Sequence, residues 1–339
     1  MKRRLLDFVI CPVCGHDLVL EANGDGAEEV ESGTLRCPSG HRFPLLDGVP
    51  RLLSDLAAHG DDARSIQDSF SREWRYFDYE RDRAWASSSE ERRDNFLAQT
   101  ELCADDLGGR VVLDAGCGVG VLSEAISTFG CEVVAGDIGH QVLAAHRHFS
   151  AHGLGRTYFL QADLMHPPFR GEIFDVIYSG GVLHHTPDTR ATLEGLLPAL
   201  APGGRIFVWL YHHVPGVSYD VKMGARKLMV KLPAPLQHAL VLSLLPQALL
   251  RQRLRIARGH QDPDSRLNAR EKLITMLDSY TCRYRWEHTP DEVEGWYREL
   301  GFVDVKTTDV GKWGFGVLAT KPAAVAHSDP ERREAVQIA

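Results

Sequence analysis

The chain has 339 residues, of which 38 are Lys or Arg and 46 are Asp or Glu, so its formal net charge is −8 at pH 7. Hydrophobic residues make up 44% and charged residues 25%, values that exclude global disorder. The length fits about two domains, and the acidic balance argues against the broad basic surface of a dedicated nucleic-acid-binding protein. Asp7 interrupts the apolar stretch after Met1 before it reaches the length of an export signal. We therefore expect a cytoplasmic protein whose cysteines are reduced.

Two short cysteine turns lie in the first 53 residues. Cys11-Pro-Val-Cys14-Gly is followed, after 22 intervening residues, by Cys37-Pro-Ser-Gly-His41. Zn²⁺ prefers four nitrogen or sulfur ligands in a tetrahedron, and each turn presents two of them. Four protein ligands leave no open position, so we expect a structural zinc site, with His16 as the alternative fourth ligand. The predicted ligands are Cys11, Cys14, Cys37 and His41.

The first turn, Cys11–Gly15, and the segment from Arg42 to Leu53 resemble the small zinc ribbon of the activator subunit of tRNA and protein methyltransferases. Members of that family usually close the second turn with a CxxC motif. The Cys37-xxx-His41 spacing is instead similar to the ribbon fused to some ribosomal RNA guanine methyltransferases. The resemblance implies a zinc ribbon over residues 1–53.

A glycine-rich turn follows the first apolar strand of the central region. Val111 to Leu113 read as a buried strand, and Asp114 precedes three glycines at alternate positions, Gly116, Gly118 and Gly120. Glycines at this spacing let the backbone approach a ligand closely. The spacing differs from the GxGxxG of dinucleotide sites, and a carboxylate at Asp114 repels a pyrophosphate but suits an ammonium group. The turn therefore favours a ligand with a methionine moiety.

Further polar residues follow the next strands in order. Asp137 ends the strand that begins at Cys131, Asp163 follows the strand from Tyr158, and Ser179-Gly180 follow the strand from Phe174. The carboxyl ends of parallel strands meet at one edge of a sheet, where ligands of open α/β folds bind. We expect Asp137 to accept hydrogen bonds from ribose hydroxyls and Asp163 to accept one from an adenine amino group.

Residues 108–211 resemble the class I S-adenosylmethionine-dependent methyltransferases of type 11, and the resemblance resumes at the helix His288–Gly301 and the strands Phe302–Val310 and Phe315–Thr320. It implies an α/β fold with a Rossmann-like sheet of seven strands and an antiparallel last hairpin. It also implies S-adenosylmethionine as cofactor and a lid formed by the aromatic segment before the core. The cofactor-binding residues that we expect are Asp114, Gly116, Gly118, Gly120, Asp137, Ile138, Ala162, Asp163, Leu164, Ser179 and Gly180.

The composition of the chain divides it into six segments. We expect a zinc ribbon (1–53), a helical linker or lid (54–107), the cofactor-binding core (108–211), a helical cap insertion (212–287), the last helix and hairpin of the core (288–321) and a flexible tail (322–339).

The cap insertion combines an uncharged stretch with a basic one. Leu232 to Leu250 lack charged side chains, but their prolines predict a buried or interface pair of helices rather than a membrane span. Residues 221–261 hold eight Lys or Arg and no acid. This pattern fits a solvated basic face, and the alternatives are an anionic acceptor, peripheral contact of residues 222–258 with an anionic membrane, or RNA.

In this family the enzyme positions the acceptor for in-line displacement and removes its proton where necessary. Candidate bases at the ends of the fourth and fifth strands are His184, His185, Tyr211, His212 and His213, and the sequence does not choose among them. We expect a methyltransferase that acts on a small molecule or on a carrier-, lipid- or sugar-linked metabolite. The alternatives are RNA base methylation through the ribbon, and a use of the cofactor other than methyl transfer, such as cyclisation or aminocarboxypropyl transfer. A further alternative is a regulator without enzymatic activity, whose ribbon binds a partner.

Overall fold

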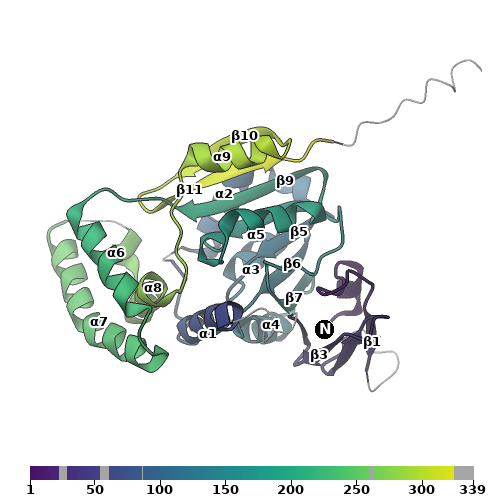
Figure 1. Ribbon diagram of the computed structural model, residues 1–339, viewed down its shortest axis with the longest axis horizontal. Coiled ribbons are helices and arrows are strands. Elements are labelled where there is room, and N and C mark those ends of the chain that lie inside the picture. The colour runs from purple at the N-terminus through teal and green to yellow at the C-terminus, as the bar shows by residue number, and fades with distance from the viewer. Residues whose placement is uncertain (23–28, 54–60, 86, 260–262, 324–339) are drawn as a thin grey trace, which may run out of the picture.

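The computed structural model describes residues 1–22, 29–53, 61–85, 87–259 and 263–323, and most of the predicted tail 322–339 lies outside these ranges. The described strands form one sheet in the order β1-β2-β3-β4-β7-β6-β5-β8-β9-β11-β10 (Figure 1). The strands are β1 Val19–Glu21, β2 Gly33–Arg36, β3 Arg42–Leu46, β4 Val49–Leu52, β5 Val111–Ala115, β6 Glu132–Asp137, β7 Thr157–Ala162, β8 Phe174–Gly180, β9 Leu200–Tyr211, β10 Val303–Val310 and β11 Gly314–Thr320.

Helices cover both faces of this sheet. The α-helices are α1 Asp61–Trp74, α2 Ser89–Thr100, α3 Val121–Ser127, α4 Gln141–Ala151, α5 Thr189–Leu196, α6 Val217–Met229, α7 Ala234–Ala257, α8 Ala269–Thr281 and α9 Pro290–Glu299. Short 3₁₀ helices are η1 Arg3–Asp7, η2 Ala104–Leu107, η3 Leu183–His185, η4 Leu197–Ala199 and η5 Pro263–Arg266. Helix α9 lies within the predicted helix His288–Gly301, and its N-cap Thr289 forms a capping box with Glu292.

Strands β5 to β9 run parallel, and β11 is antiparallel to both β9 and β10. The predicted seven-strand α/β sheet with an antiparallel hairpin is therefore present. Successive residues of β5 pack on opposite faces, as the twofold period of a strand requires. Val112 packs in the cluster that contains Phe96 of α2 and Ile126 of α3, whereas Leu113 packs in the cluster that contains Leu193 of α5.

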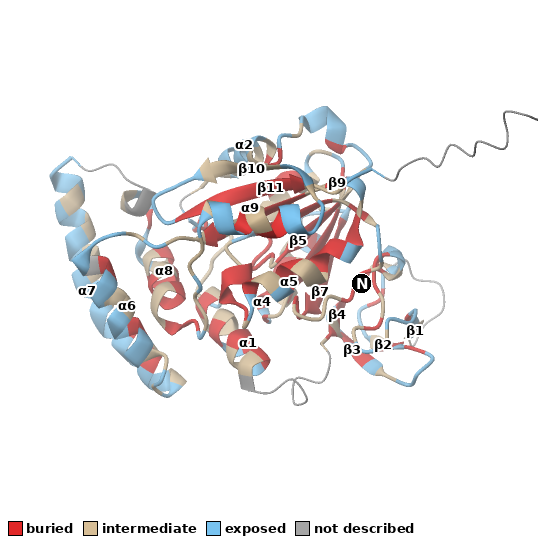
Figure 2. Ribbon diagram, turned by 45° about the horizontal axis from the view of Figure 1, so that its top comes forward, coloured by how far each residue is buried: buried red, intermediate tan, exposed pale blue. Residues whose placement is uncertain are grey.

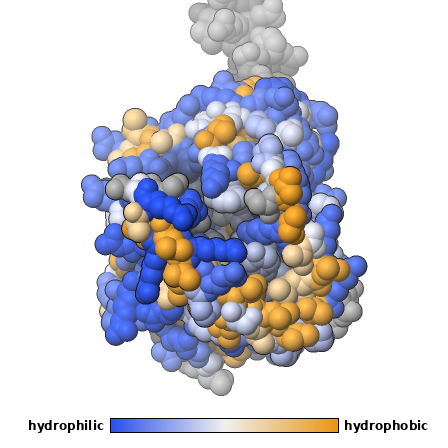
Figure 3. Space-filling model, turned by 90° about the vertical axis from the view of Figure 1, so that its left-hand side faces the viewer, coloured by the Kyte–Doolittle hydropathy of each residue, from blue (hydrophilic) through white to orange (hydrophobic). Residues whose placement is uncertain are grey.

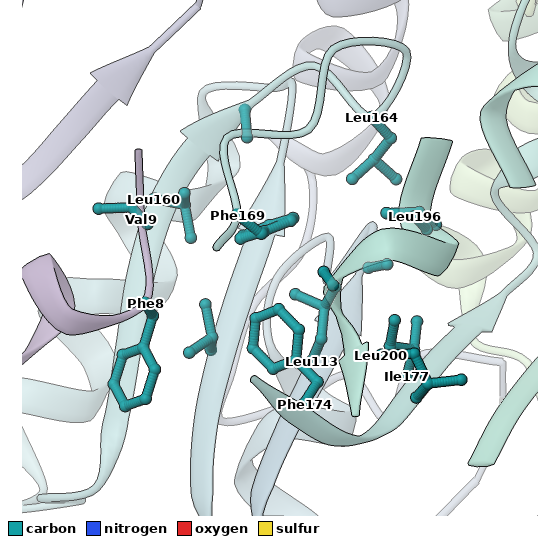
Figure 4. Close-up of a cluster of buried hydrophobic side chains, with 14 of the residues drawn as sticks. Phe8, Val9, Leu113, Leu160, Leu164, Phe169, Phe174, Ile177, Leu196 and Leu200 are labelled. Atoms are coloured by element: carbon teal, nitrogen blue, oxygen red, sulfur yellow. The ribbon is translucent and has the colours of Figure 1, made fainter. Parts of the chain in front are cut away.

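The N-terminal strands extend this sheet from seven strands to eleven. β4 pairs in parallel with β7, through Arg51 with Gln161 and Leu52 with Ala162. Figure 4 shows Phe8 and Val9 packed beside Leu160 and Phe169 of the central sheet. The expectation of a seven-strand sheet with a separate ribbon beside it is thus corrected, since the described N-terminal residues share both the sheet and the hydrophobic core. Edge pairing uses backbone N–H and C=O groups, which all residue types except proline carry, so no sequence pattern predicts it.

The described residues of the predicted cap insertion form the α-helices α6, α7 and α8 and the 3₁₀ helix η5, and α8 packs against α1. We expected a pair of buried or interface helices in Leu232–Leu250, and the expectation of a pair is wrong. One helix, α7, runs through Pro246, and its buried residues are Gln237 and Val241. Figure 2 shows α7 as largely exposed. None of the described helices combines the length and the apolar character that crossing a bilayer requires.

Candidate cofactor and acceptor site

A cavity of about 1250 Å³ opens at the carboxyl ends of β5, β6 and β7. The glycine turn after β5 forms part of its wall, and Gly116 has φ +87°. A Cβ on this residue would lie 2.3 Å from Cγ2 of Val182, so the turn accepts only glycine here without displacement of Val182. The Gly118 N–H donates to Oδ2 of Asp137 at 2.9 Å, which ties the turn to the end of β6.

The three predicted carboxylates line this cavity together. Asp114 is 3% exposed and its Oδ2 accepts the Ser123 hydroxyl at 2.6 Å, while burial raises the pKa of Asp114 to about 7. Burial also raises the pKa of Asp137, against the lowering effect of N–H groups such as that of Gly139, 2.8 Å from Oδ1. Asp163 Oδ1 accepts the backbone N–H of Met165 at 2.9 Å. The cavity is therefore acidic at this end.

The predicted cofactor residues separate into two groups. Eight line the cavity: Asp114, Gly116, Gly118, Asp137, Ile138, Asp163, Leu164 and Gly180. In the described part of the chain, Gly120, Ala162 and Ser179 do not line it. Gly120 instead precedes α3, where a Cβ would lie 3.2 Å from the Phe159 ring, and the Ser179 hydroxyl donates to the carbonyl of Ala115 at 2.9 Å. Gly120 and Ser179 therefore contact residues that adjoin the glycine turn, and neither lines the cavity as described.

Two of the predicted bases, His185 and Tyr211, line the cavity beside Asp278 of α8. His185 Nε2 lies 3.3 Å from Oδ1 of Asp278, and the Tyr211 hydroxyl donates to Oδ2 at 2.9 Å. His185 Nδ1 donates to the carbonyl of Tyr284 at 2.8 Å. Burial by itself would raise the pKa of Asp278, but its bonds to His185 and Tyr211 and the charge of Arg285 hold that pKa below its ordinary value. Asp278 is therefore a buried carboxylate that these partners keep ionised.

The other predicted bases lie elsewhere. His184 is fully buried, its ring centroid is 4.1 Å from that of Tyr211, and neither ring nitrogen has a hydrogen-bond partner among the described residues. Burial lowers the pKa of His184 well below its ordinary value, so this imidazole is neutral. His212 Nε2 lies 3.0 Å from the carbonyl of Lys312, and His213 Nδ1 lies 3.3 Å from Glu287. Neither His212 nor His213 lines the cavity as described.

Glu73, Asp278 and Arg285 are among the cavity residues that were not predicted from the sequence. Glu73 is 1% exposed, and its Oε2 has no hydrogen-bond partner among the described residues. Burial, followed by the charges of Asp278 and Asp137, raises its pKa well above the ordinary value. The Arg285 guanidinium lies 4.0 Å from the centroid of the Tyr211 ring. No local motif marks these residues, because they come from segments outside the core.

The aromatic segment before the core lies against the glycine turn. Trp74 and Trp85 line the cavity with their rings at 88° and 6.1 Å apart. A Cβ on Gly118 would lie 3.4 Å from the Trp74 ring, and the Tyr79 hydroxyl donates to the carbonyl of Val119 at 2.7 Å. This position fits the lid that the sequence predicts.

The four predicted zinc ligands also converge. The ligand atoms of Cys11, Cys14, Cys37 and His41 all lie within 4.8 Å of one another. His41 Nδ1 is 3.2 Å from Cys37 Sγ, and the Sγ atoms of Cys14 and Cys37 are 3.6 Å apart. Zn–S bonds of about 2.3 Å place the sulfur ligands of a tetrahedral ion about 3.8 Å apart, so this donor set fits zinc. His16 contacts Cys14 at 3.3 Å from outside the group.

Comparison with known proteins agrees with the geometry of the core. Ubiquinone biosynthesis O-methyltransferase of Aeromonas salmonicida (strain A449) is 30% identical over 128 residues, which are 38% of this chain and 54% of the relative. The enzyme of the same name from Pseudomonas paraeruginosa (strain DSM 24068 / PA7) is 33% identical over 129 residues, 38% of this chain and 55% of the relative. The chain thus spans about half the length of the curated relatives it matches.

Among solved structures, magnesium protoporphyrin IX methyltransferase from Synechocystis PCC 6803 with bound SAH is similar, with a TM-score of 0.48 and 20% sequence identity. The alignment covers 77% of this chain and 100% of that chain. Residues 113–208 match the family described as a methyltransferase domain. The family match and the geometry of the core thus agree on a methyltransferase domain over residues 113–208, as the sequence predicts.

Proposed function

We propose that the protein transfers a methyl group from S-adenosylmethionine to a small-molecule acceptor, free or linked to a carrier, lipid or sugar. The convergence of Asp114, Asp137 and Asp163 with the glycine turn in one cavity carries this proposal. Asp114 pairs with the ammonium group of the cofactor, Asp137 accepts from the ribose hydroxyls, and Asp163 accepts from the adenine amino group. The curated relatives bear the name of a biosynthetic O-methyltransferase, which supports an acceptor of this size.

The bound cofactor supplies an electrophilic methyl group on a sulfonium. The pair His185–Asp278 receives the proton that the acceptor loses. His185 Nδ1 donates to the carbonyl of Tyr284, and Nε2 of the same ring lies 3.3 Å from Asp278 Oδ1. In this proposal the pair shares the proton between Nε2 and Oδ1, and the Tyr211 hydroxyl holds the second carboxylate oxygen in place. Tyr211 is thus a positioning residue for the pair.

Zinc bound to Cys11, Cys14, Cys37 and His41 has a structural role in this proposal. The ribbon contributes β4 to the edge of the sheet and Phe8 to the core, so the ion stabilises one end of the methyltransferase sheet. The predicted cytoplasmic location and the membrane contact of residues 222–258 stay predictions.

The test measures binding and transfer separately. Calorimetry with S-adenosylhomocysteine should show binding that Asp137→Ala abolishes and that Asp304→Asn, an exposed carboxylate of β10, leaves unchanged. Cofactor with a labelled methyl group, incubated with a metabolite extract and with bulk RNA, should label the metabolites. Absence of binding contradicts the methyltransferase proposal, and label confined to the RNA contradicts the acceptor class.

A further inference from the structure

The wall of the cavity formed by the cap insertion is basic. Arg251 and Arg255 lie one turn apart on α7 and line the cavity, together with Lys222 of α6 and Lys272 of α8. Residues four apart lie on one face of a helix, so both arginines face the same space. Lys312, in the turn between β10 and β11, lines it as well. Four separate segments therefore bring five cationic side chains to one cavity.

Aromatic rings hold two of these cations near each other. Lys222 Nζ lies 5.3 Å from the centroid of the Tyr280 ring and 5.9 Å from that of Trp313. Lys312 Nζ lies 4.6 Å from the Trp313 centroid. A cation over an aromatic face keeps its charge and gains a preferred position. Trp313 thus places Lys222 and Lys312 along the same part of the wall.

The lining residues that the described cap helices contribute include more basic than acidic side chains. Among the described lining residues from α6, α7 and α8, Asp278 is the acidic side chain, and His185 and Tyr211 already contact it. Asp309, on β10, accepts a hydrogen bond from Gln99 at 2.9 Å. Cationic side chains from several segments that line one cavity attract an anion that enters it.

Apolar side chains lie among the cations. Ala248 of α7 and Met276 of α8 line the same wall, as does Leu267 between these helices. The outer surface of α7 is mixed too, as Figure 3 shows from this side, where strongly hydrophilic and hydrophobic side chains lie next to each other. A ligand that fits this wall has an anionic group and an apolar part.

We propose that the acceptor carries a phosphate or diphosphate group, which the basic wall of Lys222, Arg251, Arg255, Lys272 and Lys312 binds. A phosphoryl group offers three oxygens to donors from several directions and carries more charge than a carboxylate, which suits five cations from four segments. This inference rests on the proposed function, because it assigns the other end of the cavity to the cofactor. The phosphoryl group belongs either to a water-soluble phosphate ester or to a lipid phosphate.

The probe is inorganic pyrophosphate, titrated into the full chain saturated with S-adenosylhomocysteine at physiological ionic strength. We expect binding that Arg251→Ala/Arg255→Ala weakens at least tenfold. The matched control is Arg253→Ala/Arg258→Ala, which removes the same charge from exposed positions of the same helix and its C-cap that do not line the cavity as described. The control should change the affinity less than twofold. Lys312→Met should weaken pyrophosphate binding as well. Because Lys312 lies outside α7, this loss could not be explained by misfolding of that helix.

Three results would overturn the inference: no pyrophosphate binding, equal weakening in the control pair, or unchanged affinity in the cavity-facing pair. If S-adenosylhomocysteine itself fails to bind, the proposed function fails. Pyrophosphate titrated into the protein without S-adenosylhomocysteine then still tests whether the basic wall binds phosphoryl groups. The labelled-methyl assay separates the two sources, since the product of a lipid phosphate partitions into an organic phase and that of a soluble ester stays in water.

Discussion

Cofactor affinity should fall as the pH falls through 7, because the ligand's ammonium group binds the ionised form of Asp114. Burial raises the pKa of Asp114 in the free protein to about 7, so below this pH the carboxyl holds a proton that must leave before the ion pair forms. The raised pKa of Asp137 acts in the same direction.

The magnitude follows from the fraction of ionised carboxylate. The apparent Kd is multiplied by 1 + 10^(7 − pH), which is about 1.3 at pH 7.5 and about 11 at pH 6.0 for the pKa of about 7. The ratio is about eightfold, or about 1.2 kcal/mol. Calorimetry with S-adenosylhomocysteine at the two pH values measures it, since this ligand lacks the sulfonium charge and both values lie below the usual pKa of an α-amino group.

Asp114→Asn is the matched variant, because it keeps the size and can still accept from Ser123 while it removes the titrating group. It should bind more weakly at pH 7.5 and lose most of the pH dependence. Its free form should have a higher Tm at pH 8 than the unchanged protein. A carboxyl with a raised pKa opposes folding when it is ionised, and this difference should shrink as the pH falls below 7. Equal affinities of the unchanged protein at the two pH values, or a full pH effect in Asp114→Asn, would refute the reasoning.

Three further predictions concern the turn, the proton-accepting pair and the zinc site. Gly116→Ala should lower both the free energy of unfolding and the cofactor affinity by far more than Gly109→Ala, measured by denaturation and calorimetry. Both glycines have positive φ, which costs an alanine about 1–2 kcal/mol at either position. A Cβ at Gly116 would also collide with Val182, whereas a Cβ at Gly109 would meet no described atom within 4 Å. Equal losses in the two variants would therefore contradict the close approach of Gly116 to Val182. Asp278→Asn should slow labelled methyl transfer by about a hundredfold or more while S-adenosylhomocysteine binds as before, and unchanged transfer would remove the pair from the reaction. Elemental analysis should find one zinc per chain, absent in Cys37→Ser and retained in His16→Ala; loss in the His16 variant would instead make His16 a ligand.

The features that the sequence predicts are local. A strand and the acid that ends it are neighbours in the chain, so the pattern from Val111 to Asp114 indicates both the strand and the place of its carboxylate. The same holds for the N-cap of α9, where Thr289 and Glu292 lie three residues apart. Each cysteine turn likewise carries its two predicted zinc ligands within five residues, Cys11 with Cys14 and Cys37 with His41.

Tertiary structure decides the rest. The sequence does not distinguish His184 from His185, which are neighbours in η3. Of these two, His185 lines the cavity and contacts Asp278. Packing of α8 against α1 brings Asp278 and Glu73 to the same site, and their meeting depends on how the cap insertion folds back. The pairing of β4 with β7 depends on backbone groups that no side chain identifies. Contacts within a few residues follow from chain geometry, whereas contacts between distant segments follow from the packing of the whole molecule.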